Sequence, residues 1–146
     1  EHLAKAVGEY FITAVEDINL AIVFLSANHP QIYLYTTDSS LEDIPGQIGP
    51  YLTPRMVQLV CQSGKICTAD QLCEMGFFAG PGVLKKISLA AVGLNKAGPS
   101  LGMLVFYRSS SRPLTSLEMT KFASITSGLS IALKNMQQSD TVCGIG

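Results

Sequence analysis

The stretches 83-VLKKISLAAVGL-94 and 101-LGMLVFYR-108 decide the fold of this chain. Both are apolar at almost every position, which predicts strands that are buried on both faces of a sheet. The residues between them include Gly98 and Pro99, so they are expected to form a turn between neighbouring antiparallel strands. We therefore predict a central β-hairpin that other parts of the chain cover from both sides.

A long amphipathic helix is predicted directly after this hairpin, over residues 115–138. Thr115 and Glu118 have the spacing of a capping box, and Leu114 and Met119 have that of a hydrophobic staple. The apolar stripe of the helix consists of Phe122, Ile125, Leu129, Ala132, Leu133 and Met136. Residues 139–146 are expected to form a frayed tail.

The first part of the chain predicts a helix over residues 1–17 and two strands over residues 20–25 and 31–36. Residues 28–30 are expected to form the turn between these strands. Side chains on the second strand alternate between two faces, with aliphatic residues on one and tyrosines on the other: Ile32 and Leu34, then Tyr33 and Tyr35.

The middle of the chain predicts a loop over residues 38–50, then a helix that Thr53 caps and Gly64 ends. A short strand over residues 65–69 would follow, and then a long connection over residues 70–82 with room for one helical turn. These elements predict one α+β domain over residues 1–146, an antiparallel sheet with the N- and C-terminal helices on one face. The middle helix and the long connection would cover the other face and form a pocket there.

The composition limits the classes of partner. Only 14% of the residues are charged, against about 25% in an average domain, so we expect part of the surface to be covered by another chain. The net charge of −1 gives no reason to expect binding to nucleic acid or to an anionic membrane. The longest apolar run, residues 20–25, is too short to span a bilayer. Because the chain begins at Glu1 within helical periodicity, we expect a section of a longer protein.

The cysteines favour a reducing, cytoplasmic setting without a structural metal. Cys61, Cys67, Cys73 and Cys143 form no Cys-x-x-Cys pair, and no histidine lies near them in the sequence, which argues against a zinc site. Free cysteines in a chain of this composition are usually small core residues. Cys73 lies on a polar segment and is the thiol that we expect to be exposed.

Three segments of this sequence resemble the GAF domain family, and the likeness extends over nearly the whole chain. They are 88-SLAAVG-93, 101-LGMLVF-106, and 112-RPLT-115 with the capped helix that follows. Gly93 stands where the family commonly has proline, and Leu114 where it commonly has phenylalanine. Residues 62–70 are also similar to a family pattern, with Ser63 and Ile66 as departures. These motifs specify a fold well and a ligand poorly.

The resemblance implies a regulatory domain that binds a small molecule and has no catalytic residue. GAF domains commonly occur in histidine kinases, cyclases, phosphodiesterases and transcriptional regulators, with an effector domain in the same polypeptide. They often form homodimers through their terminal helices, whose arrangement would follow ligand occupancy. No cysteine here is followed by histidine, as in relatives that bind bilin covalently, and neither His2 nor His29 is well placed to ligate haem. The cofactor stays unknown.

Eight residues are candidates for binding the ligand, because together they offer aromatic rings, hydroxyl groups and charges. They are Tyr33, Tyr35, Arg55, Asp70, Phe77, Phe78, Lys86 and Ser88. Each also has an ordinary structural reading, such as core packing for the phenylalanines or turn capping for the aspartate.

Two alternatives to a ligand sensor stay open. One is a thiol redox enzyme or switch of the free methionine-R-sulfoxide reductase type, which shares the fold and would use Cys73 and Cys67. The "G-v-C-G" and "H-I-x-C-D" patterns of that family are missing here. The other is a domain whose second sheet face is filled by side chains and which only joins its terminal helices.

Overall fold

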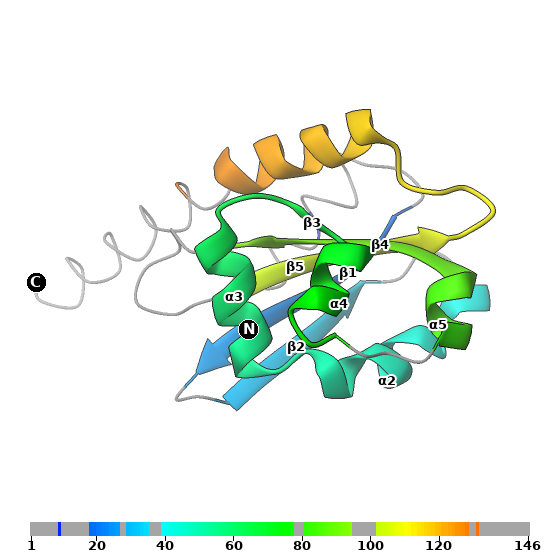
Figure 1. Cartoon of the computed structure of the whole chain (residues 1–146), viewed down its shortest axis with the longest axis horizontal. Coiled ribbons are helices and arrows are strands. Elements are labelled where there is room, and N and C mark those ends of the chain that lie inside the picture. Colours follow the sequence, from blue (N-terminus) through cyan, green and yellow to red (C-terminus); the bar gives the residue numbers. More distant parts are fainter. Residues whose placement is uncertain are drawn as a thin grey trace, which may run out of the picture.

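The computed structural model describes residues 9, 18–26, 29–35, 39–77, 81–94, 102–128 and 131. Its centre is a five-stranded sheet with the order β2-β1-β5-β4-β3, in which every neighbouring pair is antiparallel (Figure 1). The strands are β1 (Asn19–Ser26), β2 (His29–Tyr35), β3 (Cys67–Thr68), β4 (Ile87–Gly93) and β5 (Gly102–Ser109). The α+β class and the antiparallel sheet predicted from the sequence are confirmed.

β4 and β5 are the predicted central pair, with Ile87 opposite Ser109 at one end and Gly93 opposite Met103 at the other. The first apolar stretch nevertheless divides, because helix α5 (Pro81–Lys86) precedes the strand. Two lysines at the end of α5 explain the division, since cations stabilise the carbonyl end of a helix and do not suit a strand that is buried on both faces.

β2 begins earlier than predicted. His29 and Pro30 pair with Ser26 and Leu25 of β1, so they are strand residues and the prediction that they form the turn is wrong. Proline lacks the amide hydrogen that a central strand needs on both sides. β2 lies at one edge of the sheet, and an edge strand tolerates proline because only one of its sides pairs with another strand.

The middle of the chain is more helical than predicted. Residues 38–50, expected to be a loop, contain α2 (Ile44–Ile48) between the 3-10 turns Ser39–Leu41 and Gly49–Tyr51. The predicted helix is α3 (Pro54–Ser63), with Thr53 as its cap and Gly64 in the left-handed conformation (φ 67°) at its end. The expected long connection, residues 70–82, includes most of α4 (Ala69–Glu74) and the first two residues of α5. A capping box of Thr68 and Gln71 starts α4, a signal that the sequence carries.

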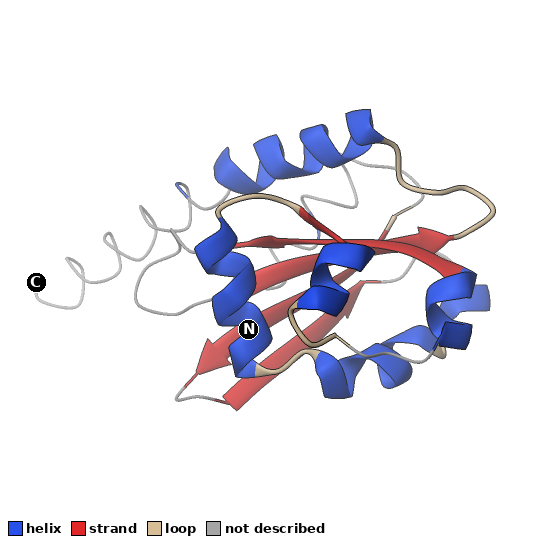
Figure 2. Ribbon diagram, viewed as in Figure 1, coloured by secondary structure: helices blue, strands red, loops and turns tan. Residues whose placement is uncertain are grey.

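The sheet has a separate core on each face. On one face, β1, β3, β4 and β5 pack against α2, α3, α4 and α5. On the other face, β1, β4 and β5 pack against the C-terminal helix, residues 116–128. Figure 1 shows this helix in yellow to orange on one side of the sheet, and Figure 2 shows the shorter helices gathered on the other. This confirms the predicted opposition of the C-terminal and middle helices.

The C-terminal helix begins as predicted. The Glu118 amide donates to Thr115 Oγ1 and the Thr115 amide donates to Glu118 Oε1, each at 3.1 Å, which is the predicted capping box. Phe122 then stacks on Phe106 of β5, with ring centroids 4.5 Å apart and 16° between the planes. The predicted helix over residues 1–17, apart from Glu9, lies outside the described residues. So do the tail, residues 139–146, and all of residues 129–138 except Ile131.

Candidate functional site

The shortness of β3 leaves both ends of β4 without a paired strand on that edge. Cys67 pairs with Ala91 and Thr68 with Ala90, whereas β4 runs on to Ile87 in one direction and to Gly93 in the other. Each of these ends lines a cavity. The cavity at the Gly93 end has a volume of about 230 Å³, and we name it the α3 cavity. The cavity at the Ile87 end has a volume of about 330 Å³, and we name it the α4 cavity.

The α3 cavity lies between the end of α3, the turn that precedes β3, the end of β4 and the C-terminal helix. Its lining consists of Val60, Cys61, Gly64, Lys65, Ile66, Val92, Gly93, Ala123, Thr126 and Ser127. Lys65 is the only charged side chain among them, and it is exposed. The cavity therefore touches both a helix of the middle layer and the helix that covers the opposite face of the sheet.

A glycine at position 93 lets α3 approach β4 closely. A Cβ atom on Gly93 would lie 2.9 Å from the Cα atom of Cys61 and 3.0 Å from its Sγ atom. The thiol of Cys61 donates to the carbonyl oxygen of Gly102 at 3.3 Å. Burial raises the pKa of Cys61, although hydrogen bonds to the backbone oppose the effect. Cys61 is thus a neutral thiol in the wall of the cavity and not an activated nucleophile.

The α4 cavity lies between the start of α4, the beginning of β4 and the segment that leads into the C-terminal helix. Its lining consists of Thr68, Ala69, Asp70, Ile87, Ser88, Leu89, Ser110, Pro113, Leu114 and Met119. Several polar groups here hold the backbone: Ser88 Oγ accepts from the Leu114 amide at 2.9 Å, and Thr68 Oγ1 accepts from the Gln71 amide at 3.5 Å. Asp70 is the only charged residue of this lining, and it is exposed.

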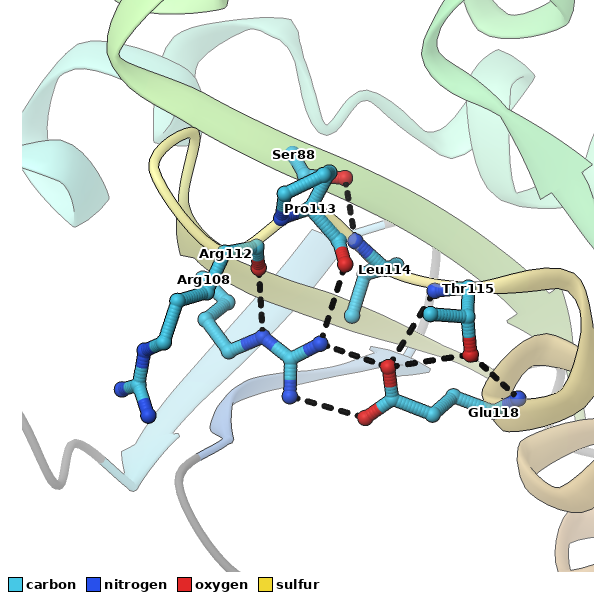
Figure 3. Close-up of polar contacts among 7 residues, drawn as sticks. All are labelled: Ser88, Arg108, Arg112, Pro113, Leu114, Thr115 and Glu118. Carbon is cyan, nitrogen blue, oxygen red and sulfur yellow. Dashed lines mark hydrogen bonds and ion pairs between the residues drawn. The ribbon is translucent and has the colours of Figure 1, made fainter.

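A bidentate ion pair fixes the segment between β5 and the C-terminal helix (Figure 3). Nη1 and Nη2 of Arg108 donate to the two carboxylate oxygens of Glu118 at 2.8 and 2.6 Å. Arg108 also donates to the carbonyl oxygens of Arg112 and Pro113, at 2.7 and 3.1 Å. The hydrogen bonds from Arg108 lower the pKa of Glu118 to about 2. The first turn of the helix is therefore tied to the sheet by charge-assisted bonds.

The layer between the sheet and helices α2 to α5, where the sequence placed the pocket, is a packed core in the described part of the chain. Phe77 is fully buried there and meets Tyr51 edge-on, with ring centroids 6.0 Å apart. Tyr107 of β5 is also buried in this layer, and its hydroxyl has no hydrogen-bond partner among the described residues. Burial raises the pKa of Tyr107 to about 12.

The predicted tyrosines lie on the face opposite to the expected pocket. Tyr33 and Tyr35 pack against the core under the C-terminal helix. Burial, with a smaller effect of the Glu9 carboxylate, raises the pKa of Tyr35. The face toward the middle helices instead carries Ile32 and Leu34, which are 37% and 47% exposed. The alternation along β2 was predicted correctly, but the assignment of its tyrosine face to the pocket was wrong.

The other predicted binding residues are also dispersed. Arg55 and Lys86 are exposed at the start of α3 and at the end of α5. Phe77 belongs to the core, and Phe78 lies outside the described residues. Asp70 and Ser88 do come together, in the α4 cavity. The seven described residues of this set are thus spread over both faces of the sheet and the surface, and a ligand-binding role for any of the eight stays a prediction.

The described thiols differ in their burial and stand in no metal-binding cluster of described residues. In the described part of the chain, no group of histidine, cysteine, aspartate or glutamate side chains could hold a metal ion. Cys67 is buried, with its Sγ atom 3.4 Å from Ser63 Oγ, and Cys73 is half-buried.

None of the described helices is long and apolar enough to cross a membrane.

Comparison with known proteins relates this chain to others through its fold alone. Neither a protein-family model nor a curated protein sequence matches it. Among solved structures, a GAF domain/HD domain protein from Geobacter sulfurreducens is similar with a TM-score of 0.63 and 13% identity, over 94% of this chain and 93% of that one.

Two further structures share the fold. The red/green cyanobacteriochrome NpR6012g4, in its red light-absorbing state, has a TM-score of 0.52 and 16% identity, over 94% of this chain and 95% of that one. Escherichia coli SdiA has a TM-score of 0.56 and 16% identity, over 91% of this chain and 60% of that one. The chain thus has a GAF-like fold, as the sequence motifs indicated.

Proposed function

We propose that this chain is a regulatory, small-molecule-binding sensor domain of a larger cytoplasmic signal-transduction protein. In this proposal it forms a homodimer through its terminal helices and controls an effector domain in the same polypeptide. The GAF-like fold supports a sensory role. The α3 cavity carries the proposal, because α3, β4 and the C-terminal helix all line it.

A ligand in the α3 cavity would act directly on the C-terminal helix. The helix is anchored near its start by Phe122, which stacks on Phe106 of the sheet. Ala123, Thr126 and Ser127 line the cavity over the following turn. An occupant would add contacts there that the empty state lacks, and such differential contacts are what a ligand needs to shift the balance between two helix arrangements.

The two alternatives receive different support. For the thiol redox alternative, Cys67 is buried, so Cys73 would have to act without it in this conformation. The second alternative is a domain that binds no ligand because side chains fill the face of the sheet under the middle helices. The buried apolar cluster in that layer agrees with this alternative, whereas the α3 cavity does not. The sensor proposal therefore depends on whether this cavity is occupied by a ligand.

Native mass spectrometry of the purified chain tests the proposal. We expect a copurified small molecule, or one that binds from a metabolite mixture, and we expect Ala123→Leu to abolish this binding by filling the cavity. Ser124→Leu places the same side chain at the neighbouring exposed position, outside the cavity lining, and should bind as the wild type does. Equal binding by the wild type and Ala123→Leu, or no binding at all, would contradict the proposal.

A further inference from the structure

We propose that the α3 cavity takes a small monocarboxylate with an apolar body, whose carboxylate pairs with the ammonium group of Lys65. This rests on the proposed function and adds the chemical class of the ligand to it. The carboxylate would lie at the turn before β3, and the apolar body would lie between the end of α3 and the C-terminal helix.

The charges of the lining favour an anion. Among the described residues, Lys65 is the only charged one that lines the cavity, and this described lining includes no carboxylate. The ion pair found within the described part of the chain joins Arg108 and Glu118, and Lys65 takes no part in it. A cationic ligand would meet an unopposed positive charge here, whereas an anion would meet its counter-ion at the rim.

The polar groups of the lining favour a single negative charge. The thiol of Cys61 already donates to the Gly102 carbonyl, and the Thr126 hydroxyl donates to the Phe122 carbonyl at 2.7 Å. The amide of Gly64 donates to the Cys61 carbonyl at 3.3 Å. In the described lining, Lys65 and the exposed Ser127 hydroxyl are the remaining side-chain donors. A dianion such as phosphate would meet only these two exposed donors and would leave the apolar part of the lining without a contact, so we expect it not to bind.

The rest of the lining and its size define the ligand body. Val60, Ile66, Val92 and Ala123 provide an apolar wall. The volume of about 230 Å³ restricts the occupant to a small molecule. Benzoate and 2-oxoisovalerate are suitable probes, because each joins one carboxylate to a compact apolar group.

Isothermal titration of the full chain with benzoate, 2-oxoisovalerate, benzamide and inorganic phosphate tests this inference. We expect both carboxylates to bind more tightly than neutral benzamide, and phosphate not to bind. Lys65→Gln should weaken benzoate binding about fivefold, the effect of an exposed ion pair of about 1 kcal/mol, and leave benzamide unchanged. Lys121→Gln removes the same charge from an exposed position of the C-terminal helix outside the lining, and should bind benzoate as the wild type does.

Hydrogen exchange supplies a second measurement. Benzoate should slow amide exchange in residues 123–127 of the wild type, and should do so less in Ala123→Leu. If benzoate binds but Lys65→Gln has the same affinity, or if Ala123→Leu does not affect binding, the inference is overturned. If no monocarboxylate binds, but the wild type copurifies with a molecule that Ala123→Leu lacks, the ligand class is wrong and the proposed function stands. If neither the probes nor any copurified molecule binds, both fail.

Discussion

Gly93 in β4 and Cys61 in α3 approach each other so closely that a Cβ atom on Gly93 would lie 2.9 Å from the Cα atom of Cys61. This nearest atom belongs to the helix backbone, so rotation of the Cys61 side chain cannot relieve the contact. Any side chain at position 93 would push α3 away from the sheet and change the wall of the α3 cavity.

We therefore predict that Gly93→Ala lowers the free energy of unfolding by about 1 to 3 kcal/mol, the usual cost of overpacking. Urea denaturation measures this change. Gly46→Ala is the matched control, since a Cβ atom there meets nothing within 4 Å; in a helix it should be neutral or stabilising by up to about 1 kcal/mol. A Gly93→Ala variant as stable as the wild type would contradict the close approach.

The Arg108–Glu118 pair predicts a loss of stability in acid. Because the folded state lowers the pKa of Glu118 to about 2, its contribution is complete above the unfolded-state pKa of about 4.3 and is lost as the pH falls from there toward 2. Glu118 is 28% exposed, so we expect about 1 kcal/mol.

Chemical denaturation at pH values between 5 and 2, spaced about one pH unit apart, checks this prediction. Glu118→Gln should be less stable at pH 5 and should lose less stability on acidification than the wild type. Glu42→Gln, at an exposed position, should follow the wild-type curve. Parallel curves for the wild type and Glu118→Gln would show that the ion pair does not stabilise the fold.

The hydroxyl of Tyr107 makes Tyr107→Phe an informative substitution. A buried hydroxyl without a partner destabilises the fold, so removing it should leave stability unchanged or raise it by up to about 1 kcal/mol. The variant should also lose less stability in alkali. Because burial raises the folded-state pKa to about 12, this tyrosine makes the fold less stable as the pH rises from about 10 toward 12. A clear loss of stability at pH 7 would instead mean that the hydroxyl has a partner.

The three described thiols should differ in reactivity. Cys73 is half-buried, whereas Cys61 and Cys67 are buried and Cys61 has a raised pKa. We predict that iodoacetamide modifies Cys73 first, and modifies Cys61 and Cys67 at a rate limited by unfolding. Peptide mapping over time gives the order, with urea-unfolded protein as the control for intrinsic reactivity. Early modification of Cys61 would contradict its burial.

The sequence predicted the parts of this fold that depend on local patterns. The two apolar stretches identified β4 and β5, and the Thr115–Glu118 spacing identified the start of the C-terminal helix, because caps and burial leave their signal within a few residues. Short helices were missed where only one or two apolar residues mark the buried side. In α2, for example, only Ile44 and Ile48 mark the buried side, and proline and glycine stand between them.

The candidate site could not be predicted in the same way. Alternation along β2 separates Tyr33 from Ile32, but it does not say which face the middle helices will cover. The α3 cavity is built from residues near positions 60, 92 and 125, which no local pattern connects. One relevant signal does lie in the sequence, where Gly93 replaces the proline common in the GAF domains that this chain resembles, but its meaning depends on the position of Cys61.

The two-residue length of β3 has a consequence for how domains of this shape can diversify. Lengthening that strand by a few positions would lay backbone along either end of β4 and cover a cavity. A change of length at this one border would therefore alter the two hollows while the pairing among β1, β4 and β5 stays the same.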